Sequence, residues 1–151
     1  MSDYRVIEVK QSVLASNDQK ADELRSKMKE KGTLLINLMS SPGSGKTTML
    51  RRTIKALKGE LDIAVMEADI DSDVDAAAIS EAGAQTIQLH TGGMCHLDAA
   101  MCAQGLESLA AGDADVIFLE NVGNLVCPAE FDTGAGVNVT ILSVPEGDDK
   151  P

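Results

Sequence analysis

The chain has 151 residues, enough for one domain with a sizeable core, and its 44% hydrophobic and 25% charged residues are ordinary for a soluble globular protein. The formal net charge of −11 argues against a nucleic-acid partner, because binding phosphates requires clustered Lys and Arg. It indicates either a solvated acidic surface or a protein that gathers divalent cations. Three cysteines, no signal-peptide pattern and no run of roughly 20 apolar residues predict a cytoplasmic protein with reduced thiols and no membrane segment.

Two elements precede the first glycine-rich segment. The stretch Tyr4–Val9 alternates weakly between apolar and polar residues and predicts a short strand or an extended arm. Ser12–Lys31 has the pattern of an amphipathic helix that Ser16 or Asn17 caps and Gly32 ends. We expect this N-terminal region to pack against the domain that follows it.

A phosphate-binding loop is predicted at Ser40–Thr48, a glycine-rich segment between the apolar run Thr33–Met39 and the helix-compatible stretch Thr47–Lys58. In such an arrangement the N–H groups of the turn surround phosphate oxygens, and the helix N-terminus adds partial positive charge. The usual motif opens with Gly where this chain has Ser40. The predicted nucleotide-binding residues are Gly43, Ser44, Gly45, Lys46, Thr47 and Thr48, with Lys46 on the β- and γ-phosphates and Thr47 on Mg²⁺.

Strands and helices alternate along the rest of the chain. This alternation predicts an α/β fold, a three-layer P-loop NTPase domain over residues 33–151 with a mostly parallel sheet, preceded by the arm and helix of residues 1–32. Ligands of such sheets bind at the carboxyl ends of the strands, so we expect the functional residues along one edge. The other predicted strands are 62–68, 84–90, 115–120 and 137–144, and the other predicted helices are 76–82 and 95–111.

Acidic residues at strand ends are candidates for the magnesium site. A P-loop hydrolase needs an acidic residue at the end of a second strand, and Asp69 and Glu120 both qualify. The spacing of Glu120 and Gly123 resembles the Asp-x-x-Gly element with which GTPases sense the γ-phosphate. The alternative for Asp69 is a solvated loop carboxylate, and Asp75 fits equally a site residue or a helix cap.

Cysteine and histidine side chains form a candidate transition-metal site. Cys95 and His96 open the predicted helix 95–111, and Cys127 follows another strand end. A helix N-terminus favours the thiolate, and two thiolates with one imidazole suit Ni²⁺, Zn²⁺ or Cu ions. Three ligands are fewer than the four of a closed zinc site, which indicates a labile or subunit-bridging site. The residues alone leave buried, unligated cysteines open as the alternative, and Cys102 is predicted to be a core residue.

Three segments together resemble the HypB family of hydrogenase nickel-incorporation GTPases. They are Asn37–Thr48 with its Ser-Pro-Gly-Ser-Gly-Lys-Thr-Thr loop, Thr91–Ala99 with its Cys-His pair, and Phe118–Pro128 with Glu-Asn-Val-Gly-Asn-Leu-Val-Cys. The resemblance implies GTP hydrolysis coupled to Ni²⁺ delivery for [NiFe] hydrogenase maturation. It also implies a nucleotide-dependent homodimer, a HypA-type nickel protein and the hydrogenase large-subunit precursor as partners. By the same resemblance Cys95, His96 and Cys127 would bind Ni²⁺ or Zn²⁺, and Asp69, Asp75 and Glu120 would lie in the Mg²⁺ and switch regions.

Departures from the family pattern leave other functions open. Ala100 stands where many members have a further histidine, and the N-terminus lacks a Cys-rich or His-rich extension. The 151 residues also lack the Asn-Lys-x-Asp motif that recognises guanine, so we expect a C-terminally truncated chain with an incomplete sheet. One alternative is a zinc- or nickel-binding module with weak or no turnover. Another is a related metallochaperone for urease or cobalamin enzymes, against which the segment 120–127 argues.

Overall fold

A parallel sheet organises the computed structural model of the chain, which describes residues 4–8, 16–40, 45–68, 74–92, 97–109, 114–122 and 131–142. Within these residues the sheet has six strands in the order β1-β4-β3-β5-β2-β6, and every neighbouring pair is parallel. The predicted α/β class with a parallel sheet is therefore confirmed. The strands are β1 (Tyr4–Glu8), β2 (Leu34–Ser40), β3 (Ile63–Ala68), β4 (Gln85–His90), β5 (Val116–Glu120) and β6 (Val137–Ile141).

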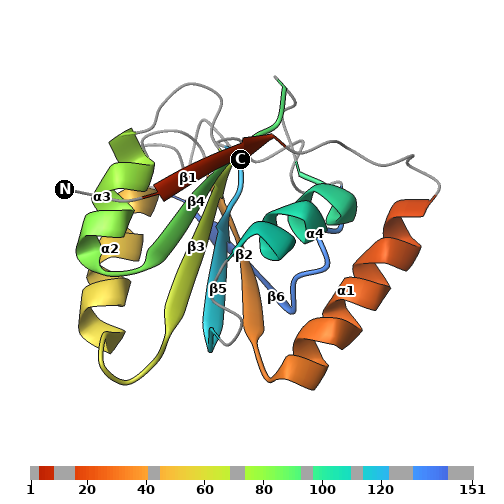
Figure 1. Cartoon of the computed structure of the whole chain (residues 1–151), viewed down its shortest axis with the longest axis horizontal. Coiled ribbons are helices and arrows are strands. Elements are labelled where there is room, and N and C mark those ends of the chain that lie inside the picture. Colours follow the sequence, from red (N-terminus) through yellow and green to blue (C-terminus); the bar gives the residue numbers. More distant parts are fainter. Residues whose placement is uncertain are drawn as a thin grey trace.

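Helices cover both faces of this sheet, as the alternation of elements predicts. In Figure 1, α1 and α4 lie against one face, and α2 and α3 lie against the other. Each face has its own apolar core, one built around Met28 and Met101 and the other around Leu50 and Ile79. The helices are α1 (Asn17–Lys31), α2 (Lys46–Leu57), α3 (Val74–Ala82) and α4 (Ala99–Ser108).

The N-terminal segment is a strand rather than a free arm. β1 pairs in parallel with β4, from Tyr4 opposite Thr86 to Glu8 opposite His90, and forms one edge of the sheet. The following helix ends as predicted at Gly32, whose φ of 71° is the left-handed conformation common at helix ends. The cap predicted at Ser16 forms no side-chain hydrogen bond to the helix.

The start of α4 corrects a sequence-based expectation. The helix begins at Ala99 and not at Cys95, because the Asp98 carboxylate accepts a hydrogen bond from the Met101 N–H at 2.9 Å and caps the first turn. The helix ends at Ser108, and Leu109 is extended, so the prediction was also too long at that end. The pair Cys95 and His96 thus precedes the helix in sequence instead of opening it.

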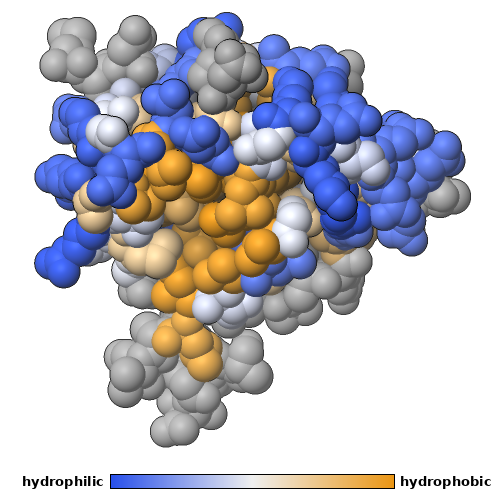
Figure 2. Space-filling model, turned by 90° about the horizontal axis from the view of Figure 1, so that it is seen from below, coloured by the Kyte–Doolittle hydropathy of each residue, from blue (hydrophilic) through white to orange (hydrophobic). Residues whose placement is uncertain are grey.

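Polar and apolar residues gather at opposite ends of the sheet. Figure 2, which views the molecule from below, shows an apolar patch at the amino ends of the strands, where Leu34, Leu61 and Val137 are about two-fifths exposed. The carboxyl ends of β2, β3 and β5 lie at the other end and carry the candidate site residues. Within the described ranges, no helix is both long and apolar enough to cross a lipid bilayer.

Candidate phosphate-binding site and the segments around it

The turn from the glycine-rich loop into α2 is set by Gly45. Its φ of 92° lies in the left-handed region, which residues other than glycine rarely adopt. Its carbonyl accepts the Met49 N–H at 2.9 Å, the first hydrogen bond of the helix. Lys46, Thr47 and Thr48 follow in the first turn, with Thr47 half-buried and Thr48 exposed. Gly43 and Ser44, also predicted to bind phosphate, lie outside the described residues.

The lysine of the loop reaches the end of β5. Its Nζ lies 3.1 Å from the backbone oxygen of Asn121, to which it donates, and 3.6 Å from Glu120 Oε1. The Lys46 side chain is 13% exposed and that of Glu120 is 3% exposed, so this ion pair is largely shielded from water. The structure thus brings together two residues that the sequence analysis picked from different motifs, Lys46 from the loop and Glu120 from the second strand.

Glu67 is a second buried carboxylate at this edge that the sequence analysis did not place in the site. It lies on β3 directly opposite Glu120 of β5, so both side chains project from the same face of the sheet. Only 1% of Glu67 is exposed. The signal that could have identified it is a carboxylate inside the apolar run 63–68, since buried carboxylates are rare without a function or a partner.

An asparagine ladder (Asn121, Asn37 and Asn138) lies beside the ion pair and links the residue after β5 to β2 and β6. The Asn121 amide donates to Asn37 Oδ1 at 2.9 Å, and the Asn37 amide donates to Asn138 Oδ1 at 3.0 Å. Asn121 Oδ1 accepts the Val122 N–H at 2.8 Å, and the Asn121 N–H donates to the Leu38 carbonyl. The ladder joins the segment that begins with Glu120 to β2 and β6, and the sequence analysis missed it.

The other acidic candidates are not tested by the structure. Asp69 and Gly123 lie outside the described residues, and Asp75 lies in α3 with a side chain that is not described. The predicted metal ligands Cys95, His96 and Cys127 also lie outside these residues. In the part of the chain that is described, no three His, Cys, Asp or Glu side chains are grouped closely enough to hold a metal ion.

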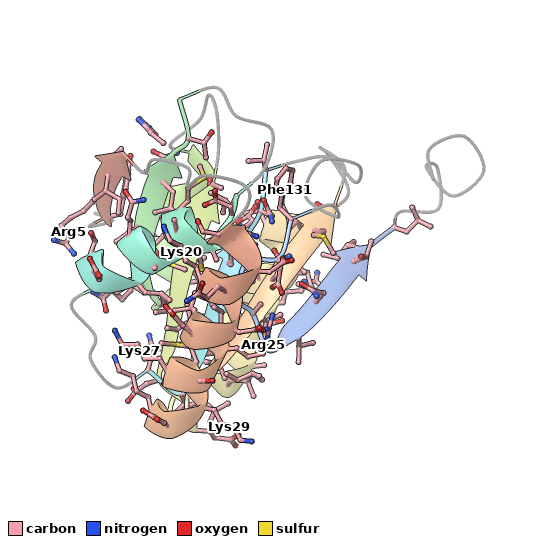
Figure 3. All side chains as sticks on the ribbon, turned by 90° about the vertical axis from the view of Figure 1, so that its right-hand side faces the viewer. Arg5, Lys20, Arg25, Lys27, Lys29 and Phe131 are labelled. Atoms are coloured by element: carbon pink, nitrogen blue, oxygen red, sulfur yellow. The ribbon has the colours of Figure 1, made fainter. Side chains whose placement is uncertain are left out.

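The N-terminus of α1 binds the chain at Ala99, shortly after Cys95 and His96, and at Asp132, shortly after Cys127. Asn17 Oδ1 accepts the Ala99 N–H at 2.8 Å, and its Nδ2 donates to the Asp132 carbonyl at 3.0 Å. About two helical turns further along α1, Arg25 donates to both carboxylate oxygens of Asp132, at 2.6 and 2.9 Å, and to the carbonyl of Ala135. Figure 3 shows Arg25 on α1, the helix that makes these contacts. A single helix therefore anchors two segments that are distant in sequence.

Cys102 is confirmed as a core residue. It is fully buried in α4, and burial, with a smaller contribution from the charge of Asp98, raises the pKa of its thiol to about 12. Because the thiolate is the reactive and metal-binding form, this cysteine is not a candidate ligand near neutral pH.

We expect Cys102 to resist alkylation in the folded chain at pH 8, where a thiol of pKa about 12 remains protonated. Mass spectrometry after iodoacetamide treatment measures this, and the same reaction in guanidinium chloride is the control, since unfolding restores an ordinary thiol pKa. Equal labelling of Cys102 in the folded and unfolded chain would contradict the prediction.

The fold and this edge define a class of protein, the P-loop nucleotide-binding α/β domains. The profile "CobW/HypB/UreG, nucleotide-binding domain" matches residues 34–143, and the chain belongs to this family, in its HypB branch. The chain is 50% identical over its full length to the hydrogenase maturation factor HypB of Rhizobium leguminosarum bv. viciae, covering 50% of that protein. It spans about half the length of the first curated relatives it matches.

Two solved structures share the fold. HypB from Helicobacter pylori in complex with nickel is 41% identical, with a TM-score of 0.80 over 89% of this chain and 63% of that chain. The hydrogenase maturation factor HypB from Archaeoglobus fulgidus is 40% identical, with a TM-score of 0.81 over 90% of this chain and 66% of that chain. At these identities the likeness extends beyond the fold to the family.

Proposed function

We propose that this chain is a nucleotide-switched nickel chaperone that binds and hydrolyses GTP and delivers Ni²⁺ for [NiFe] hydrogenase maturation in the cytoplasm. The observation that carries the proposal is the contact between Lys46 and the end of β5, since it joins the phosphate loop to the segment that begins with Glu120. The family and the HypB relatives support the same function. The proposed partners are a second copy of the chain, a HypA-type nickel protein and the hydrogenase large-subunit precursor.

The residues at the edge of the sheet suit a triphosphate with magnesium. The Lys46 ammonium, held between the Glu120 carboxylate and the neutral Asn121 carbonyl, would move onto the β- and γ-phosphates, whose oxygens would replace both partners. The Thr47 hydroxyl and the Glu120 carboxylate are hard oxygen donors of the kind Mg²⁺ prefers, and Asp69 would add a third. Bound Mg²⁺ supplies charge neutralisation between the phosphates.

Whether GTP or GDP is bound would change the nickel site through a short stretch of chain. Glu120 and Gly123 are proposed to sense the γ-phosphate, and Cys127 follows Gly123 by four residues. Cys127 would bind the metal together with Cys95 and His96, with Ni²⁺ or Zn²⁺ as the ion that two thiolates and an imidazole favour. A rearrangement of Glu120–Gly123 on hydrolysis would therefore displace one of the three ligands.

The test is the nickel affinity of the 151-residue chain with GDP and with a non-hydrolysable GTP analogue. We expect a difference of about tenfold, which corresponds to about 1.4 kcal/mol of coupling. Cys127→Ser should lose nickel binding, and Cys102→Ser is the matched control that should retain it because Cys102 is buried in the core. Equal nickel affinities in the two nucleotide states would contradict the coupling. Nickel binding without any nucleotide binding would favour the metal-binding module instead.

A further inference from the structure

The asparagine ladder places two polar amide side chains, those of Asn37 and Asn121, inside the protein. Asn121 is fully buried and Asn37 is 2% exposed, and the strand neighbours Leu35 and Leu119 on the same face belong to the apolar core. Burying an amide is costly unless it is hydrogen-bonded, and an apolar side chain would fill the same place without that requirement. Since both amides are paired, the ladder fixes a particular geometry rather than merely filling the core.

What the ladder fixes is the peptide that meets the phosphate-loop lysine. Asn121 is bound through its N–H, its side-chain oxygen and its side-chain amide, and its carbonyl accepts from Lys46 at 3.1 Å. Two of these bonds lead to β2, one to the Leu38 carbonyl and one to the Asn37 side chain. The backbone bond continues the sheet, whereas the Asn37 bond is the one that a change of side chain can remove.

We propose that Asn37 is a positioning residue for the phosphate site. It holds the Asn121 peptide against β2, so that the first residues of the Glu120–Gly123 segment are set for a γ-phosphate before the nucleotide arrives, and the Lys46 ammonium lies beside them until it moves onto the phosphates. Asn37 itself does not touch the nucleotide; it acts through Asn121. Through Asn138 the same bonds also join β6 to this site. The inference rests on the proposed nucleotide function and names a residue that the loop motif does not contain.

The test is the ratio of two affinities in Asn37→Leu, a substitution that keeps the branching of the side chain, with a somewhat larger volume, and removes its hydrogen-bonding groups. We expect affinity for a non-hydrolysable GTP analogue to fall about tenfold and affinity for GDP to change less than about threefold, because the displaced segment faces the γ-phosphate. Thr33→Val is the matched control: it removes a buried bond of 2.7 Å to the Ala114 carbonyl at the other end of β2. It should lower the melting temperature and leave the ratio unchanged.

A second variant covers the case in which Asn37→Leu fails to fold. Asn138 is exposed, so Asn138→Val leaves the fold intact while removing the acceptor of the Asn37 amide, and it should shift the ratio in the same direction by about twofold. Variants that bind both nucleotides equally less tightly, or that change only the melting temperature, overturn the proposal for Asn37 alone. A wild-type chain that binds neither nucleotide overturns both this proposal and the proposed function.

Discussion

Lys46→Ala is expected to lower the affinity of the chain for GTP about 100-fold and to reduce turnover to the level of the uncatalysed reaction. The ammonium lies against the end of β5, and the loss of its charge-assisted bonds to phosphate costs about 1.5–3 kcal/mol each. Isothermal titration with a non-hydrolysable GTP analogue measures the affinity, and phosphate release measures the turnover. Indistinguishable values for Lys46→Ala and the wild-type chain would remove the GTPase claim.

The same substitution also affects stability, which has to be separated from binding. Removing Lys46 leaves the buried Glu120 carboxylate without this partner, and breaking a buried ion pair costs about 3–5 kcal/mol before any discount for the 13% exposure of the lysine. The matched control is the double variant Lys46→Ala/Glu120→Gln, which removes the charge as well. We expect it to recover part of the lost stability in urea unfolding while its GTP affinity stays low. Recovery of binding together with stability would show that Lys46 acts only through the fold.

Local sequence signals were sufficient for the elements around the site. The apolar run before Ser40 and the glycine before Lys46 predict a strand, a turn and a helix, and β2 and α2 begin within a residue of the predicted positions. The contact between Lys46 and Glu120 was not predictable in this way. It depends on β5 lying next to β2, and strand order is determined by the packing of the whole domain rather than by either segment.

The residues that were missed are polar side chains within apolar strands. Glu67 and Asn37 lie inside runs that predict buried strands, and a pattern of hydrophobicity treats them as interruptions. Their type was the available signal, since a buried carboxylate or amide requires partners that a strand alone does not supply. The helix predicted at 95–111 was too long at its start because the residues before Ala99 also fit a helical pattern. Asp98 is a preferred N-cap residue, and it marks the true start of α4.

Asn17→Ala is expected to destabilise the chain by about 2–4 kcal/mol, a large effect for one side chain. The Asn17 side chain, in a residue only 4% exposed, satisfies the Ala99 N–H and the Asp132 carbonyl, and each backbone group left buried without a partner costs about 1–3 kcal/mol. Urea unfolding followed by circular dichroism measures the change. Gln19→Ala is the matched control on the same helix, since its amide bonds only the exposed Glu23, and it should stay within about 0.5 kcal/mol of the wild type.

Asn17→Asp separates the two contacts of this anchor. A carboxylate still accepts the Ala99 N–H, but it turns an oxygen toward the Asp132 carbonyl and buries a charge in a residue only 4% exposed, so its cost should exceed that of Asn17→Ala. A larger loss in Asn17→Asp than in Asn17→Ala would show that the contact with the Asp132 carbonyl requires a donor. Equal stability of Asn17→Ala and Gln19→Ala would mean that the bonds of Arg25 and the core packing of Leu24 and Met28 are sufficient to hold α1 in place.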